Sequence, residues 1–157
     1  MQQIHLTTFI SAPIERVFDL SRSIDLHKIS ASDTKEEAVA GIITGLINLN
    51  ETVTWKAKHL FKIRFFTSLI TAMEKPVYFC DEMQKGDFKS LRHEHHFKKV
   101  ENGTIMIDIL EFETPYKKAG RIFNKLYLTK YLSSFISKRN KRIKEYAESQ
   151  KWKLILQ

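Results

Sequence analysis

The sequence is poor in the residues that mark several specialised classes of protein. Its 157 residues include one cysteine, three prolines and five glycines. A single Cys80 cannot form an intramolecular disulfide, and so little proline and glycine excludes a collagen-like or proline-rich linker protein. No stretch approaches the roughly 18 consecutive apolar residues that a membrane-spanning helix needs. These absences favour a soluble globular protein.

The composition is that of a folded domain. Apolar residues make up 43% of the chain and charged residues 28%, so we expect residues 1–157 to form a single domain with a substantial core. Residues 1–10 lack the basic region and continuous apolar run of a secretory signal. Together with the lone cysteine, this predicts a cytoplasmic protein.

The net charge of +8 is distributed unevenly. Residues 1–116 carry 14 basic and 16 acidic side chains, whereas residues 117–157 carry 12 basic and 2 acidic ones. A basic stripe on the last part of the chain is first explained as the solvated face of a helix whose other face is buried, and second as a surface that contacts RNA, a ribosome or an anionic membrane. We expect no DNA partner. The residues of this stripe are Lys130, Lys138, Lys141 and Lys144, with Lys117, Lys118, Arg121 and Lys125 as an extension.

Hydropathy patterns predict a strand, two short helices and then a run of strands. Residues 3–10 alternate as a strand does, and Pro13 suits the first turn of a helix that continues to about Ser21. A second short helix is expected at 24–29 and a loop at 30–35. Between 36 and 112 the period is mostly two, which predicts strands at 36–40, 51–60, 62–73, 77–83, 90–100 and 104–112. Asn102-Gly103 predicts a tight hairpin between the last two.

The C-terminal segment has helical periodicity in two phases. Ala119, Ile122, Phe123 and Leu126 share one direction, whereas the apolar residues after Leu128 centre on nearly the opposite one. This predicts a short helix at 118–126, a bend near 127–129 and a long helix at 128–148. The order of elements indicates an α+β fold, in which about six or seven antiparallel strands can wrap one long helix and leave a pocket between them.

Several motifs in this order resemble the SRPBCC (START-like, helix-grip) superfamily, and especially its polyketide-cyclase-like and ligand-binding bacterial members. The resemblance covers nearly the whole chain. It rests on residues 9–18, on 71–79 with Pro76, on Gly86-Asp87-Phe88, on 93–97, on Gly103-Thr104, and on Asp108 and Pro115. The segment after Pro115, often glycine-rich in relatives, here runs Tyr116-Lys117-Lys118-Ala119-Gly120.

The resemblance implies a helix-grip fold, with a curved antiparallel sheet around the C-terminal helix and a hydrophobic cavity between them. It implies binding of a lipid, sterol, polyketide or other apolar molecule, but no particular reaction, because this fold hosts binders, transfer proteins and cyclases. Aromatic residues that could form the cavity wall are Trp55, Phe65, Phe79, Phe97 and Phe135.

Three histidines lie close together at positions 93, 95 and 96. On a strand, His93 and His95 share one face while His96 points to the other. The first two could be polar lining of the pocket, or they could lie on a solvated face. A zinc site needs three or four ligands, so it would also require a remote carboxylate such as Asp108 or Glu111. We therefore assign no metal ligand from the sequence.

Asp108 and Arg139 are charged residues at positions with apolar neighbours. A buried acid needs a partner, which His93, His95 or Arg139 could supply. Arg139 lies on the apolar face of the long helix, where it could pin the helix to an acid on the sheet or anchor an acidic head group of a ligand.

Three functions are compatible with these residues. The first is non-catalytic binding of an apolar or amphipathic small molecule. The second is a cyclase- or aromatase-like enzyme that uses His93, His95 and Asp108 as acid and base. The third is docking on an anionic surface through the basic helix. No dinucleotide-binding loop, P-loop or nucleophile elbow is present, so we expect no cofactor.

Overall fold

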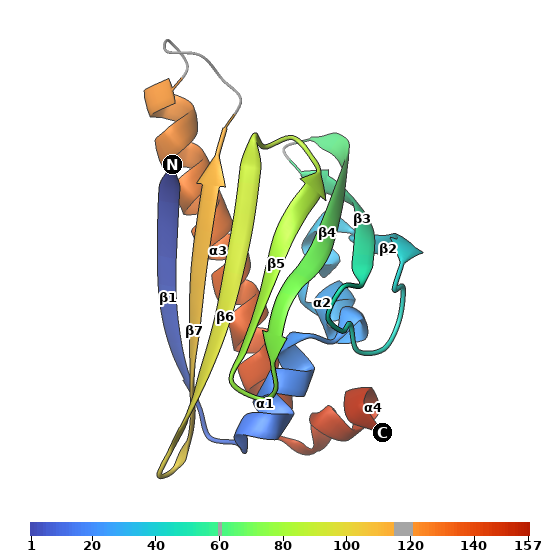
Figure 1. Cartoon of the computed structure of the whole chain (residues 1–157), viewed down its shortest axis with the longest axis vertical. Coiled ribbons are helices and arrows are strands. Elements are labelled where there is room, and N and C mark those ends of the chain that lie inside the picture. The colour runs from blue at the N-terminus through green and yellow to red at the C-terminus, as the bar shows by residue number, and fades with distance from the viewer. Residues whose placement is uncertain (60, 115–120) are drawn as a thin grey trace.

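The protein is described by a computed structural model that covers residues 1–59, 61–114 and 121–157, with the side chains of 121–124 excepted. One seven-stranded antiparallel sheet has the order β1-β7-β6-β5-β4-β3-β2. The first and last strands in sequence are therefore neighbours, and the hairpins follow one another across the sheet (Figure 1). The strands are β1 (Gln2–Ile10), β2 (Glu37–Gly41), β3 (Thr52–His59), β4 (Lys62–Glu74), β5 (Tyr78–Lys85), β6 (Ser90–Val100) and β7 (Gly103–Glu113).

The helices lie on one side of this sheet. Figure 1 shows the long α3 running behind the sheet, with α1 at its lower end and α2 behind the β3–β4 side. The helices are α1 (Ile14–Ser21), α2 (Ile24–Ser30), α3 (Arg121–Ala147) and α4 (Lys153–Leu156), with 3-10 turns η1 (Ser32–Thr34) and η2 (Gln150–Trp152). The α+β, helix-grip architecture predicted from the sequence is confirmed.

Alternation of side chains determines which face of the sheet is buried. On β3, Val53, Trp55 and Ala57 are buried, whereas the residues between them are half-buried. Strand β7 alternates in the same way over its whole length. Because the side chains of a strand alternate between faces, one face of each strand packs inward against the helices.

The two short helices begin where the sequence predicts. Helix α1 starts directly after Pro13, which needs no amide donor at that position. Helix α2 is capped by Ser23, whose hydroxyl accepts a hydrogen bond from the Leu26 amide at 3.1 Å. The short connection between the two helices keeps both on the same side of the sheet.

The predicted bend near residues 127–129 is wrong. Helix α3 is continuous from Arg121 to Ala147, and at about 1.5 Å per residue it is roughly 40 Å long. The bend was inferred on the assumption that both apolar directions are buried, but Leu126 is 67% exposed and Tyr127 is 49% exposed. Because these side chains are not buried, the helix needs no bend. Residues 118–120 of the predicted short helix lie outside the described residues.

Smaller differences lie at the edges of elements. Strand β5 begins and ends slightly later than the predicted 77–83 segment, and the 3-10 turn at 32–34 lies within a segment expected to be a loop. The C-terminal turn η2 and helix α4 have no counterpart in the sequence prediction. Arg16 of α1 lies over the ring of Trp152 at 4.3 Å and donates a hydrogen bond to the Ala147 carbonyl, which holds this end of the chain in place.

Two clusters of buried side chains form the core. The larger one surrounds Phe18, which makes edge contacts with the rings of Phe79 and Phe97 at centroid distances of 5.6 and 5.3 Å. The smaller one joins Phe112 of β7 to Ile136 of α3. Among the described residues, no helix is long and apolar enough to span a membrane.

Candidate functional site

A cavity of about 580 Å³ lies between the inner face of the sheet and helices α2 and α3. Its wall is mainly apolar and aromatic, because the inward positions of β3, β4 and β5 face it across from α3. The apolar side chains that contribute most clearly are those of Trp55, Ile70, Phe79, Leu110, Leu132 and Phe135.

The cavity brings together most of the residues proposed from the sequence. Trp55, Phe79, His93, His95, Phe135 and Arg139 line it. Phe65 also borders it, but its side chain is 58% exposed because Phe65 is paired with Lys56 on the outer face of the sheet. Phe66, the partner of Trp55 in the β3–β4 ladder, occupies the inward position.

Phe97 and Asp108 differ from the prediction that they line the pocket, because neither belongs to the described lining. Phe97 is 4% exposed and packs against Phe18 and Phe79 in the larger core cluster. Asp108 is fully buried behind the cavity wall. Both residues support the wall without forming its surface.

Asp108 is the centre of a buried polar network. Its Oδ1 lies 2.9 Å from His93 Nε2 and 3.3 Å from Arg139 Nη1, and its Oδ2 accepts a hydrogen bond from Asn140 Nδ2 at 2.7 Å. Burial raises the pKa of the carboxyl, but the hydrogen bond from His93, the contact with the His95 ring and the charge of Arg139 outweigh burial and hold the pKa well below its usual value.

Arg139 joins helix α3 to this network. Its Nη2 also donates a hydrogen bond to the Ser21 carbonyl at 3.0 Å, at the end of α1. The guanidinium is therefore paired with an acid on the sheet, as one of the two interpretations from the sequence proposed, and it also contributes to the cavity lining.

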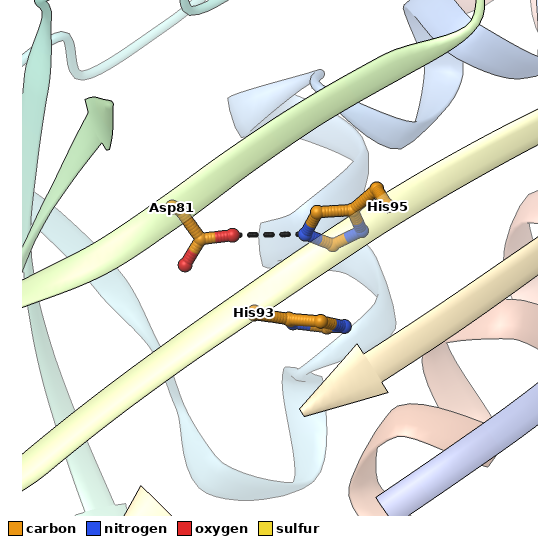
Figure 2. Close-up of side chains that lie close together, drawn as sticks. All are labelled: Asp81, His93 and His95. Carbon is orange, nitrogen blue, oxygen red and sulfur yellow. Dashed lines mark hydrogen bonds and ion pairs between the residues drawn. The ribbon is translucent and has the colours of Figure 1, made fainter. Parts of the chain in front are cut away.

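Asp81, which the sequence analysis did not single out, completes a cluster with the two histidines. Figure 2 shows its carboxylate facing the ring of His95, with the ring of His93 beside it. Asp81 Oδ2 lies 2.8 Å from His95 Nε2, and Ser68 Oγ donates to Asp81 Oδ1 at 3.1 Å. Burial opposes ionisation of Asp81, but the hydrogen bond from His95 outweighs it and lowers the pKa to about 2.

The strand register explains this cluster. Asp81 lies directly opposite His93 in the β5–β6 ladder, and His95 lies two residues further along the same face of β6. The two imidazole rings are 3.8 Å apart at their centroids, and His95 stacks on Phe79 at 4.1 Å. Burial and then the proximity of His95 lower the pKa of His93. His96, on the other face, binds Glu94 instead.

The catalytic hypothesis requires that His93 and His95 face the cavity, and they do. Their side chains are only 12% and 3% exposed. A buried imidazole held by a carboxylate is an arrangement that can accept or donate a proton. The geometry is therefore compatible with the enzymatic alternative.

A second polar cluster lies elsewhere on the cavity wall, around Glu36. The carboxylate binds His27 Nε2 at 2.5 Å and His59 Nε2 at 3.2 Å, and His59 Nδ1 lies 2.5 Å from the Tyr131 hydroxyl. Burial raises the pKa of Glu36, but the hydrogen bonds from the two histidines outweigh it and lower the pKa to about 2. Burial and then the charge of Glu36 raise the pKa of Tyr131.

No motif in the sequence predicted this second cluster. His27 and His59 are isolated in sequence, and Glu36 directly precedes the short strand β2. Only the packing of α2 and α3 against the edge of the sheet brings these residues together. The alternation of β3, which places His59 on the same face as Trp55 and Ala57, was the one available signal.

The basic stripe on α3 is partly used within the protein. Lys138 pairs with Asp33 at 3.1 Å, and Lys144 Nζ lies 2.7 Å from both the Phe9 carbonyl and Glu148. Lys130 and Lys141 are exposed. Lys117 and Lys118 lie outside the described residues. Docking on an anionic surface stays a prediction.

The fold places the chain in a structural class. It is the helix-grip fold of START-like proteins, which the sequence motifs had predicted. Among solved structures, it is similar to the protein TTHA0849 from Thermus thermophilus, with a TM-score of 0.71 and 18% identity over 90% of this chain and 97% of that one.

Two further structures show how widely this fold is shared. The KanY protein has a TM-score of 0.72 and 14% identity, over 95% of this chain and 100% of that one. The major latex-like protein 151 of Panax ginseng has a TM-score of 0.68 and 13% identity, over 94% and 98%. No protein-family model and no curated protein sequence matches the chain. At these identities the likeness establishes the fold alone.

Proposed function

We propose that this protein binds an apolar or amphipathic small molecule in the cavity between its sheet and helix α3, as a cytoplasmic binding protein. The observation that carries the proposal is the cavity itself. Its volume of about 580 Å³ lies within the range of roughly 300–1,000 Å³ that is typical of small-molecule sites. Its wall is mainly apolar and includes two clusters of polar side chains.

Those two clusters favour a ligand with polar groups on an apolar body. One consists of Asp81, His93 and His95, and the other is formed by Glu36 and its histidine and tyrosine partners. Aromatic side chains, including Trp55 and Phe135, line the wall as well. Such a wall stabilises an apolar ligand through burial, while a few fixed polar groups orient it.

A second candidate is an enzyme of the cyclase or aromatase type, supported by the orientation of His93 and His95 into the cavity. The two candidates differ in what happens to the bound molecule. A ligand recovered chemically unchanged after long incubation supports binding alone, whereas turnover that is lost in His93→Asn with ligand affinity retained supports catalysis.

The binding proposal is tested by filling the cavity. Ala57 is 6% exposed and lines the wall, so Ala57→Phe places a ring where the ligand would lie. The matched control is Ala40→Phe, at an exposed position on the edge strand β2. The probe is the fluorescent amphiphile 8-anilinonaphthalene-1-sulfonate.

We expect the wild type and Ala40→Phe to bind the probe with equal affinity and a stoichiometry of one. We expect Ala57→Phe to lose that affinity while keeping its circular dichroism spectrum. Equal binding by all three proteins would place the probe outside the cavity and contradict the proposal. Val53→Phe, at the next inward position but one on the same strand, is the alternative should Ala57→Phe not fold.

A further inference from the structure

The cluster of Asp81, His93 and His95 has the composition and spacing of a metal site. Each residue offers one potential ligand atom, and these three atoms all lie within 4.8 Å of one another. Ligands around a tetrahedral Zn²⁺ at about 2.1 Å lie roughly 3.4 Å apart. The three atoms are therefore close enough together for one ion to bind them after the side chains adjust.

The backbone supports this arrangement. His93 and His95 point to the same side of one strand, and Asp81 lies directly opposite His93 on the neighbouring strand. The ligands come from two paired strands in the middle of the sheet, where neither strand is an edge. Ligands held on regular strands keep their spacing better than ligands on loops.

The two histidines of the cluster have the kind of carboxylate partner that metal-binding histidines usually have. Asp108 Oδ1 lies 2.9 Å from His93 Nε2 and 3.2 Å from His95 Nδ1, so one carboxylate faces a nitrogen of each ring. Ser68 holds the other oxygen of Asp81. Carboxylates on the outer nitrogens of ligand histidines fix the ring orientation and raise ligand basicity.

The polar atoms of His95 give an independent reason to expect a cation. His95 is 3% exposed, and its Nδ1 is buried without a hydrogen-bond partner of suitable geometry among the described residues. Its two ring nitrogens face two carboxylates, Asp81 at 2.8 Å and Asp108 at 3.2 Å. A metal ion on Nε2 would leave the single N–H of a ligand imidazole on Nδ1, the nitrogen that faces Asp108.

The formal charges agree. Asp81 and Asp108 are two carboxylates, and in the part of the chain that the structure describes, Arg139 is the one arginine or lysine that pairs with either of them. Arg139 contacts Asp108. Asp81, which lines the cavity, therefore pairs with no arginine or lysine among the described residues. The two carboxylates thus share one arginine, and a cation bound at Asp81 would balance the second charge.

The geometry points to a site for one divalent transition-metal ion of the Zn²⁺ class, held by Asp81, His93 and His95, with Asp108 as the outer partner of both histidines. Imidazole and carboxylate donors suit zinc and its neighbours in the first transition series. Three protein ligands leave one position of a tetrahedral ion open. Because all three ligands line the cavity, we expect this position to face it. An oxygen of a ligand in the cavity could bind there.

The test uses untagged protein that has been treated with a chelator and then dialysed. Co²⁺ is added as a spectroscopic probe, because four-coordinate Co²⁺ absorbs strongly in the visible range, and Zn²⁺ binding is measured by isothermal titration calorimetry. We expect one equivalent of each metal to bind, and Zn²⁺ to abolish the Co²⁺ absorption. Absence of both the absorption and the heat in the wild type would overturn the proposal.

Variants locate the ion. Asp81→Asn, His93→Asn and His95→Asn are expected to lose the Co²⁺ absorption, and Asp108→Asn to weaken Zn²⁺ binding by about 10–100-fold. His96→Asn, in the same histidine run but on the other face of β6, is the matched control and should bind as the wild type does.

Glu36→Gln controls for the second histidine cluster of the cavity and should also bind normally. Metal binding that persists in the three ligand variants, or that disappears in His96→Asn or Glu36→Gln alone, would place the ion elsewhere and contradict the proposal. The assay contains no organic ligand, so its failure leaves the proposed binding of a small molecule untouched.

Discussion

Arg139 of helix α3 donates a hydrogen bond to Asp108 of strand β7 at 3.3 Å, in the interior of the protein. The same carboxylate contacts His93, so a single buried acid joins the long helix to the cavity wall. The pair should therefore affect both the stability of the fold and the shape of the cavity wall.

The first prediction concerns the removal of this acid. Asp108→Ala leaves the guanidinium of Arg139, which is 7% exposed, without its carboxylate partner. Breaking one side of a buried ion pair typically costs about 3–5 kcal/mol. We expect a loss of this size in the free energy of unfolding, measured by urea titration.

Glu111→Ala is the matched control for Asp108→Ala. Glu111 is on the same strand, but it lies near the surface and binds the Gln3 side chain at 3.0 Å. We expect a change of less than about 1 kcal/mol. Equal effects of the two substitutions would show that Asp108 is not the centre of the buried network.

The second prediction concerns acid pH. The pKa of Glu36 is about 2 in the folded protein against 4.5 ordinarily, so its ionised form stabilises the fold above pH 4.5. This contribution is lost as the pH falls from about 5 toward 2. The free-energy difference between the wild type and Glu36→Gln should therefore be large at pH 7 and should narrow by roughly 2–3 kcal/mol across that range.

Denaturant unfolding at several pH values measures this narrowing. Glu37→Gln, at the neighbouring exposed position, is the control and should follow the wild type at every pH. A difference between the wild type and Glu36→Gln that stays constant down to pH 2 would contradict the proposed role of His27 and His59 as partners of the ionised carboxylate.

The third prediction uses the two tryptophans. Trp55 lines the cavity, whereas Trp152 lies under Arg16 at the C-terminal end of the chain. An apolar ligand should change the emission of Trp55 because it replaces water next to the indole ring. We expect the response to disappear in Trp55→Phe and to remain in Trp152→Phe. The opposite pattern would place the ligand outside the cavity.

The fourth prediction separates the cavity lining from the core. Phe79 lines the cavity, whereas Phe97 packs behind it. Phe79→Leu and Phe97→Leu should each destabilise the fold by about 1 kcal/mol. Only Phe79→Leu should change the affinity for 8-anilinonaphthalene-1-sulfonate. If Phe97→Leu changed that affinity as strongly, our description of the wall would be wrong.

The sequence predicted the fold well because two signals are local. Alternation along β3 shows which side chains point inward, and Asn102-Gly103 marks the β6–β7 hairpin. The bend in the C-terminal helix was predicted wrongly because periodicity alone does not show whether an apolar side chain is covered. Leu126 is apolar and exposed.

The site was harder to predict because it depends on strand pairing and helix packing. His93, His95, Asp108 and Arg139 stood out by their chemistry, but the position of Asp81 opposite His93 follows only from the β5–β6 register. Glu36 and His59 are 23 residues apart, and no local pattern connects them. Contacts of this kind appear only once the sheet is assembled.

The most direct test of the central claim is native mass spectrometry of the purified protein, first as isolated and then with a panel of fatty acids, sterols and aromatic polyketides. Our account predicts a complex with one small molecule per chain, which is lost in Ala57→Phe and retained in Ala40→Phe. Spectra that contain only the unliganded chain across the whole panel would contradict it.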